Sequence, residues 1–256
     1  MSFFFLAQLL FPKQFSYIFP WNYSRFSMKW LSGNTVFELL FPRLCSCCGN
    51  RLLQSESCIC SYCIFHFPKT HYHLLPDNPV EEIFWGRVKL KSATAFLFFS
   101  KGSQYQKLIH QLKYQRGTDV GRILGQHLGS DLSNSRRFFN IDYIIPVPLH
   151  PNKEKKRGYN QSLIIAEGMS LSMRKPILDG NLYRKLENPT QTRKNRFQRW
   201  KNVEGIFDVR NATELKLKHV LLIDDVITTG STLEAACHPL VQAGAEVSIA
   251  TIGHVS

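Results

Sequence analysis

The stretch VLLIDDVITTGST at residues 220–232 constrains the fold most, because it joins an apolar strand to a loop without bulky side chains. Four apolar residues run directly into the adjacent acids Asp224 and Asp225, and hydroxyl residues with a glycine follow. Neighbouring side chains on a strand point to opposite faces. We therefore expect the two acids to act as separate acceptors rather than as a close proton-transfer pair.

The loop after the acids has the composition of a phosphate-binding site. Its residues are Thr228, Thr229, Gly230, Ser231 and Thr232, and a helix is expected to open at about Ser231. Such a loop offers backbone N–H groups, hydroxyl groups and a glycine that can adopt positive φ. The stretch lacks the Gly-Lys-Ser/Thr signature of a P-loop and the G-x-G-x-x-G signature of dinucleotide sites. The alternative is an ordinary capped helix start, but the combination with an acid pair favours a phosphate ligand.

Strands and helices alternate from about residue 141 onward, which predicts an α/β domain with a parallel sheet flanked by helices. Strands are expected at 92–100, 141–149, 220–223 and 245–253, and helices at 104–117, 119–132, 160–173 and 231–244. Gly117 is expected to end the helix before it. Asn160 either caps the helix that follows it or contacts a ligand.

Six of the seven cysteines lie within residues 45–63. They include two C-x2-C pairs, Cys45/Cys48 and Cys60/Cys63, separated by eleven residues. Two such pairs suit one zinc ion held tetrahedrally by four thiolates. Cys47 and Cys58 are left over, so Cys58/Cys60 or Cys47/Cys48 are alternative ligands, and disulfides or buried free thiols are alternatives to zinc. The rest of the chain is not disulfide-rich, which favours a reducing compartment and zinc.

The net charge of +13 is concentrated in three windows. Residues 101–122, 150–157 and 184–201 carry net charges of +4, +3 and +6, so the rest of the chain is neutral overall. Concentrated positive charge favours polyanions such as phosphates, pyrophosphate or nucleic acid. A solvated surface that aids solubility is the alternative.

The first residues are apolar and aromatic, but their apolar run ends at Pro12 and is too short to span a bilayer. Basic residues before the run and a small-residue cleavage site after it, as in a signal peptide, are not evident. We expect residues 1–28 to form a poorly ordered or peripheral extension, residues 29–75 a zinc-binding module with a linker, and residues 76–256 the α/β domain. We further expect a cytoplasmic protein without a transmembrane segment.

The 13-residue stretch resembles the phosphoribosyl pyrophosphate (PRPP) signature of type I phosphoribosyltransferases, and the whole chain resembles the ComF family of competence-associated proteins. IIPVPLHPNKEKKRGYNQS at 144–162 is similar to the family's first strand, pyrophosphate-side loop and following helix. NPTQTRKNRFQRWKNVEGIF at 188–207 is similar to its Gln- and Arg-bearing segment, and the double cysteine knuckle to its N-terminal zinc module. The resemblance covers about residues 29–256 and implies a phosphoribosyltransferase-like domain at 76–256. The two extra cysteines depart from the simplest four-cysteine pattern.

The resemblance implies a role for each matching residue. Asp224 and Asp225 hold ribose hydroxyls together with Mg²⁺, and the loop binds the 5-phosphate. The implied PRPP-binding set is Asp224, Asp225, Val226, Thr228, Thr229, Gly230, Ser231 and Thr232. Lys156 and Arg157 are candidates for pyrophosphate, with Arg157 joining the acids as a catalytic residue. Gln191, Arg193 and Arg196 are candidates for a lid over the site.

Two functions are compatible with these motifs. The first is a phosphoribosyltransferase, linked to DNA uptake, that displaces pyrophosphate from PRPP through an oxocarbenium-like transition state with a nitrogen nucleophile. The second is a non-catalytic PRPP-sensing adaptor that binds single-stranded DNA and works with DNA-uptake proteins. For the second, Phe197 and Trp200 would be stacking platforms for bases, although their spacing also fits core packing.

Overall fold

The computed structural model describes residues 41–255 except residues 101, 115–116 and 186–204. Residues Arg43–Ser256 form one compact unit, separate from the unit Met1–Pro42. The expected N-terminal extension lies outside the described residues. The domain boundary expected at residue 75 stays a prediction.

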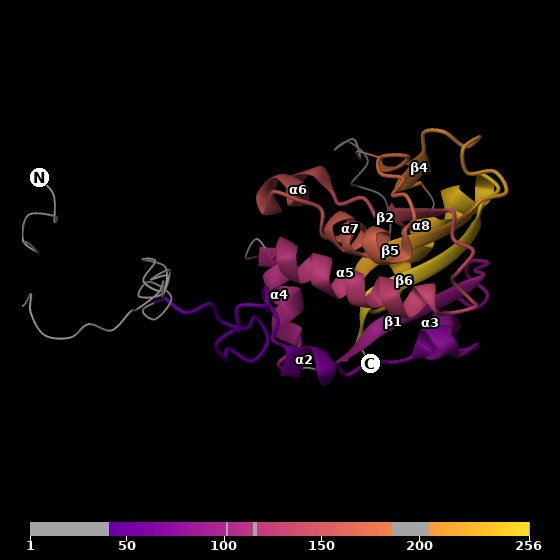
Figure 1. Cartoon of the computed structure of the whole chain (residues 1–256). Coiled ribbons are helices and arrows are strands. Elements are labelled where there is room, and N and C mark those ends of the chain that lie inside the picture. The colour runs from indigo at the N-terminus through magenta and orange to yellow at the C-terminus, as the bar shows by residue number, and fades with distance from the viewer. Residues whose placement is uncertain (1–40, 101, 115–116, 186–204, 256) are drawn as a thin grey trace, which may run out of the picture. The chain divides into compact units, whose positions relative to one another are not determined.

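A four-stranded parallel sheet with the strand order β1-β6-β5-β2 forms the centre of this unit (Figure 1). Its strands are β1 (Ser92–Phe99), β2 (Tyr143–Pro146), β5 (His219–Ile227) and β6 (Glu246–Val255). The sequence-based expectation of an α/β fold with a parallel sheet is confirmed. Because β5 lies between β6 and β2, the segment that follows it leaves the sheet from an interior strand.

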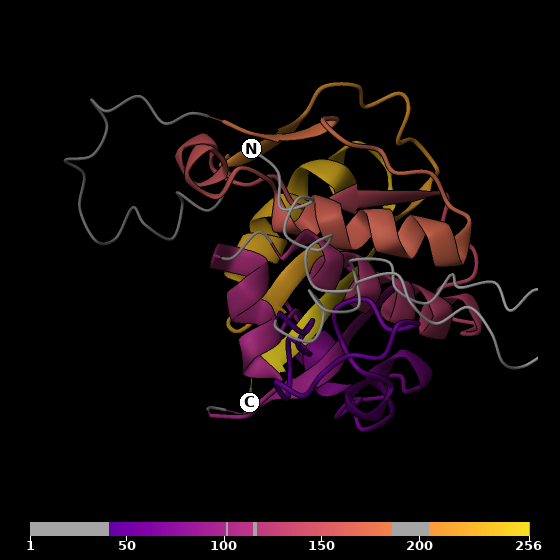
Figure 2. The same ribbon diagram turned by 60° about the vertical axis from the view of Figure 1, so that its left-hand side comes forward.

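Helices cover both faces of the sheet (Figures 1 and 2). They are α4 (Gln106–Tyr114), α5 (Thr118–Ser133), α7 (Gln161–Met173) and α8 (Ser231–Gln242). Leu221 and Ile223 of β5 are buried in the core that α4, α5 and α7 share, whereas Val220 and Leu222 are buried with α8 on the other face. The alternation of strand side chains thus gives the molecule two cores, and every residue of β5 up to the acids is buried.

Two glycines bring α5 and α7 into backbone contact. A Cβ atom at Gly125 would lie 2.2 Å from the carbonyl oxygen of Ile165, and one at Gly168 would lie 2.1 Å from that of Arg122. Any side chain at either position would force the helices apart. This close packing fixes the position of α7, whose N-terminus lies beside the end of β5.

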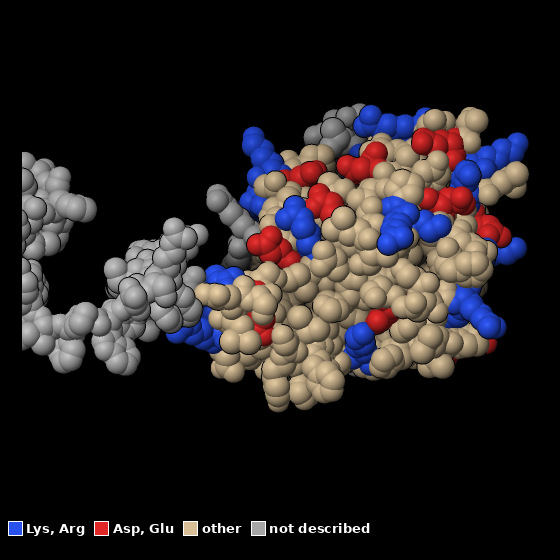
Figure 3. Space-filling view, viewed as in Figure 1, with Lys and Arg blue, Asp and Glu red and all other residues tan. Residues whose placement is uncertain are grey.

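The basic segment expected to be a pyrophosphate-side loop instead forms a short helix, α6 (Pro151–Arg157). Pro151 occupies the first helical turn, where a proline costs no hydrogen bond, and Gly158 ends the helix with φ of 84°. The lysines between them have favourable helix propensity. The loop prediction was therefore wrong. Figure 3 shows Lys and Arg side chains over α6, with Asp and Glu side chains spread across the same face.

Several short elements surround this framework. They are α2 (Ser61–Phe65), the 3-10 helix η1 (Tyr72–Leu74), α3 (Pro79–Glu82) and the antiparallel pair β3 (Leu182–Arg184) and β4 (Phe207–Val209). The segment expected to be a linker after the cysteines is tied to the sheet, because the backbone N–H of Thr70 donates to the carbonyl oxygen of Phe96 in β1 at 3.0 Å. Gly117 precedes α5 rather than ending α4, which stops at Tyr114. Among the described residues, no helix has the length and apolar character needed to cross a membrane.

Candidate functional site

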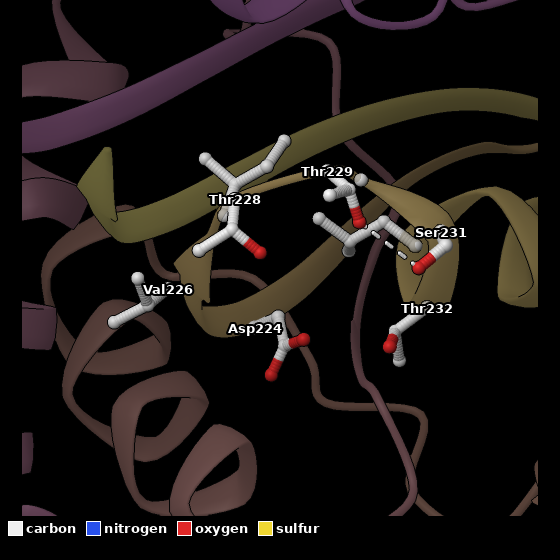
Figure 4. Close-up of a pocket in the computed structure, with 9 residues that line it drawn as sticks. Asp224, Val226, Thr228, Thr229, Ser231 and Thr232 are labelled. Atoms are coloured by element: carbon white, nitrogen blue, oxygen red, sulfur yellow. Dashed lines mark hydrogen bonds between the residues drawn. The ribbon is translucent and has the colours of Figure 1, made fainter. Parts of the chain in front are cut away.

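β5 carries the acid pair to the carboxyl edge of the sheet, where the loop and the first turn of α8 form a pocket (Figure 4). The loop pocket is lined by Asp224, Val226, Ile227, Thr228, Thr229, Gly230, Ser231, Thr232 and Leu233. Its empty volume is about 240 Å³, including the part open to solvent. Every predicted PRPP-binding residue except Asp225 lines it. The carboxyl edge of a parallel sheet is where α/β folds hold their ligands.

Gly230 determines the shape of the loop pocket. Its φ of 72° is left-handed, and an added Cβ would lie 2.7 Å from Cγ2 of Ile83 and 3.1 Å from the ring of Phe84. Because glycine has no side chain to cap α8, the N–H groups of the first turn are left for a ligand. The hydroxyl groups of Thr229 and Ser231 lie 3.1 Å apart beside them (Figure 4).

Arg87 holds the back of the loop. Its Nη1 atom donates to the carbonyl oxygens of Thr229 at 2.9 Å and Ile83 at 3.0 Å, and its Nη2 atom forms an ion pair with Glu234 in the first turn of α8. With the Thr229 carbonyl held from behind, the loop is supported in its observed conformation. Sequence reasoning missed Arg87, which lies 142 positions before Thr229 and carries no local signal.

The two carboxylates have different partners. Asp224 Oδ1 accepts hydrogen bonds from Ser162 Oγ at 3.0 Å and from the backbone N–H of Asp225 at 2.8 Å. Asp225 Oδ2 lies 3.0 Å from Nζ of Lys113 on α4. Burial, and then the charge of Asp225, raise the pKa of Asp224 to about 7. Asp224 therefore faces the loop pocket and α7, whereas Asp225 is engaged by α4.

Asn160 caps α7, which decides between its two expected roles. Its Oδ1 atom accepts from the N–H of Ser162 at 3.1 Å, and its Nδ2 atom donates to the carbonyl oxygen of Val147 at 3.0 Å. The cap places Ser162 in the first turn of α7, within reach of Asp224. The sequence signal for the cap was visible, but the role of Ser162 depends on the packing of α7 against β5.

The predicted basic residues lie outside the lining of the loop pocket. Lys156 is exposed on α6, and Arg157 is half-buried and donates to Oε1 of Gln161 at the start of α7. Gln191, Arg193 and Arg196 lie outside the described residues, as do Phe197 and Trp200.

Four thiols gather in a separate cluster, which we call the cysteine centre. The Sγ atoms of Cys45, Cys48, Cys60 and Cys63 all lie within 4.8 Å of one another. None of the seven cysteines, all of which are described, is in a disulfide. Backbone N–H groups point at one of the sulfurs: those of Cys60 and Cys47 lie 3.3 Å and 3.4 Å from Cys45 Sγ.

These surroundings favour a thiolate at Cys45. Burial acts to raise its pKa, but the N–H groups of Cys60, Cys48 and Cys47 bring it down to about 7. Four converging sulfurs, one of them a ready thiolate, fit a tetrahedral metal ion such as zinc. Cys47 and Cys58 stand outside the four, and Cys237 is a fully buried thiol in the core.

Comparison with known proteins agrees with this arrangement. Residues 160–253 match the family description "Phosphoribosyl transferase domain". Competence protein F of Haemophilus influenzae is 31% identical over 143 residues, which are 54% of this chain and 62% of that protein. Competence protein ComFC of Bacillus subtilis is 32% identical over 108 residues, 42% of each chain. DNA utilization protein YhgH of Escherichia coli K12 is 27% identical over 210 residues, 79% of this chain and 86% of that protein.

The chain belongs to the ComF family. It has the phosphoribosyltransferase-type fold, with a parallel sheet flanked by helices. This ComF-family chain resembles solved structures more weakly. A glutamine PRPP amidotransferase of B. subtilis is 20% identical with a TM-score of 0.39, covering 55% of this chain and 30% of that one. A purine phosphoribosyltransferase of Pyrococcus horikoshii is 21% identical with a TM-score of 0.34, covering 54% and 73%.

The matched part of the ComF-family chain contains most of the site. Residues 160–253 include Ser162, both acids and the whole loop pocket. The cysteine centre, Arg87 and Lys113 lie before it in the sequence. Two supports of the site, Arg87 and Lys113, are therefore contributed by a part of the chain that this family description does not cover.

Proposed function

We propose that this ComF-family chain binds PRPP with Mg²⁺ in the loop pocket. The observation that carries the proposal is the single pocket in which Asp224 and the Thr228–Thr232 loop meet at the carboxyl edge of β5. The uncapped N–H groups of α8 and the hydroxyls of the loop suit a 5-phosphate. Asp224 is the first residue in sequence that lines the pocket, and its carboxylate suits the ribose hydroxyls.

We further propose that the bound PRPP is a substrate, whose phosphoribosyl group passes to a nitrogen nucleophile while pyrophosphate leaves. Val147 N–H donates to the carbonyl oxygen of Ile223 at 2.9 Å, so the segment leading to α6 leaves the sheet beside the acids. This course of the chain supports the proposal that Arg157 and Lys156 bind pyrophosphate. Mg²⁺, when bound, would supply charge neutralisation for the leaving group. Gln191, Arg193 and Arg196 remain the candidates for a lid.

Titration calorimetry with Mg–PRPP tests the binding step. We expect the wild type to bind one equivalent, and Asp224→Asn to bind at least about tenfold more weakly because the carboxylate is lost. Asp179→Asn, which removes an exposed carboxylate away from the loop pocket, is the matched control and should bind as the wild type does. Absence of heat with the wild type would overturn the ligand assignment. If the wild type binds Mg–PRPP, release of pyrophosphate after nitrogenous bases are added would show that the phosphoribosyl group is transferred.

We propose that the cysteine centre holds one structural zinc ion through Cys45, Cys48, Cys60 and Cys63. Four thiolates fill the coordination sphere, so a substrate has no open position. The metal would contribute to folding rather than to chemistry. The fit of the four sulfurs to one ion supports this proposal.

A second function, a non-catalytic adaptor for single-stranded DNA, is favoured by the exposed lysines of α6. Lys153, Lys155 and Lys156 all project into solvent, and the names of the relatives refer to competence and DNA utilization. A gel shift with single-stranded DNA across a salt series tests it. The triple Lys→Gln variant should bind more weakly, with a shallower salt dependence. Equal binding by the variant would count against α6 as the contact surface.

A further inference from the structure

A half-buried ion pair connects the acid pair of β5 to α4. Nζ of Lys113 lies 3.0 Å from Oδ2 of Asp225, and the two side chains are 27% and 14% exposed. Lys113 belongs to the basic window 101–122, which the sequence presents as part of a surface for polyanions. At this residue the positive charge instead faces inward, toward a carboxylate of the same chain.

α4 is fastened on both sides, which keeps Lys113 in place. Tyr159 Oη, just before α7, donates to the carbonyl oxygen of Leu112 at 2.7 Å. On the other side, Gln111 Nε2 donates to the carbonyl oxygen of Ser46, between the first two cysteines of the cysteine centre, at 3.3 Å. The two residues just before Lys113 are therefore bonded, one to the segment that begins α7 and the other to the cysteine segment. Because these contacts already hold the backbone of α4, pairing with Asp225 does not require the backbone at Lys113 to become ordered.

The charge balance at the end of β5 depends on this lysine. Two adjacent, poorly exposed carboxylates repel one another, and they would also repel a phosphorylated ligand. Burial and the charge of Asp225 raise the pKa of Asp224, whereas Ser162 and Lys113 act to lower it. Lys113 thus offsets one of the two negative charges without entering the lining of the loop pocket.

We propose that Lys113 is a positioning residue of the site: it holds Asp225 toward α4 and balances its charge, so that Asp224 is the carboxylate presented to the loop pocket. The ligand in this inference rests on the proposed function, but the ion pair and its effect on the acids do not. Lys113 acts through Asp225 and does not touch the ligand.

A double-mutant cycle measured by Mg–PRPP calorimetry tests the proposal. Lys113→Met keeps an unbranched side chain of nearly the same length and removes its charge, and we expect binding about tenfold weaker than in the wild type. In an Asp225→Asn background the same change should alter binding by less than about twofold, because its partner is gone. Lys113→Arg should restore most of the loss. Equal losses in both backgrounds, or no loss from Lys113→Met alone, would overturn the proposal.

A matched control comes from a second ion pair of similar exposure. Nζ of Lys69 lies 2.9 Å from Asp131, with side chains 28% and 21% exposed, and neither residue lines the loop pocket. Lys69→Met should therefore destabilise the fold to a similar degree and leave Mg–PRPP affinity unchanged. An equal loss of affinity in Lys69→Met would mean that general destabilisation, not positioning, explains the result.

A ligand-free measurement separates this proposal from the proposed function. Without Lys113, ionising Asp224 costs the folded state more, so the denaturation midpoint of Lys113→Met should fall relative to that of the wild type as the pH rises from about 5 to about 8. The groups that act on the acids are Ser162 of α7, Lys113 of α4 and the acids themselves. Asp225→Asn should narrow this gap, because Lys113 then loses its ion-pair partner and acts on Asp224 alone. If the wild type gives no heat with Mg–PRPP, the ligand assignment fails, and a gap that does not change with pH overturns the role of Lys113 by itself.

Discussion

The cysteine centre and the loop pocket are built in opposite ways. The four thiols of the centre come from one short segment, residues 45–63, and two repeated C-x2-C turns bring them together. The loop pocket has an equally local lining, residues 224–233, but its supports come from Arg87, α4 and α7, far apart in the sequence. A site made by local turns can be recognised from spacing alone. The supports of the second site exist only after the chain has folded.

The two regions nevertheless share a core. Cys45, Cys60 and Cys63 are buried in the same cluster as Leu108 of α4 and Leu124 of α5. The cysteine centre therefore contributes to the layer that holds α4 against the sheet.

The largest effect is expected at the cysteine centre. Cys63→Ser removes one of the four thiolates proposed to hold the ion, so zinc should be lost with several kcal/mol of stability. Metal analysis and thermal denaturation measure the two effects. Cys58→Ser is the control, because this cysteine stands outside the four, and it should retain one equivalent of zinc. Retention of zinc by Cys63→Ser would contradict the ligand set.

A smaller effect is expected where the loop pocket needs a glycine. Gly230→Ala combines left-handed strain with a clash against Ile83 and Phe84, and should cost about 2–3 kcal/mol of unfolding free energy. Gly158→Ala has a similar φ of 84° but meets no atom within 4 Å, so it should cost only about 1 kcal/mol. Chemical denaturation of both variants isolates the packing contribution. Equal costs would show that Ile83 and Phe84 do not support the loop as described.

Asp224 should make stability depend on pH. Its folded pKa of about 7 lies above its ordinary value, so the stability associated with its protonated form is present below about pH 4 and is lost as the pH rises through 7. Asp224→Asn keeps an oxygen for Ser162 and removes the charge. It should gain about 1–3 kcal/mol relative to the wild type at pH 8 and little at pH 4, because the carboxyl group is partly screened by solvent. Denaturation at the two pH values measures the difference, and an equal gain at both would contradict the raised pKa.

The smallest effect is expected at a remote support of the loop. Arg87→Ala removes the hydrogen bond to the Thr229 carbonyl and the ion pair with Glu234, and should weaken Mg–PRPP binding by roughly fivefold, or about 1 kcal/mol. Arg122→Ala is the control, since it also loses an ion pair, with Glu167, but lies on α5. Calorimetry compares the two variants. Equal weakening of Mg–PRPP binding in both variants would show that the contacts of Arg87 with Thr229 and Glu234 have no specific role in binding.

The sequence predicted the elements with strong patterns and missed those without them. α7 and α8 were expected at 160–173 and 231–244, and the structure has them at Gln161–Met173 and Ser231–Gln242. β2 is shorter than expected because prolines limit it. β3 and β4 have three residues each, which is too few to show a periodic pattern. α6 was missed because its residues are nearly all polar and so show no apolar periodicity.

The residues of the site also divide into those with a local sequence pattern, which were predictable, and those without one, which were not. Asp224 and the loop were predictable because strand, acids, hydroxyls and helix start follow one another in 13 residues. Ser162, Arg87 and Lys113 were not, because each reaches its partner only through tertiary packing. Lys113 was even attributed to a surface charge cluster, since a lysine in sequence carries no sign of the carboxylate that it will face.

The central claim is that the acid end and the phosphate end of the loop pocket hold one ligand. A crystal structure of the chain with Mg–PRPP tests it most directly. We predict the 5-phosphate within hydrogen-bonding distance of the N–H groups at the start of α8, and the ribose hydroxyls facing Asp224, with Asp225 still paired to Lys113. A PRPP molecule bound elsewhere, or one whose phosphate lies away from Thr228–Thr232, would contradict the account.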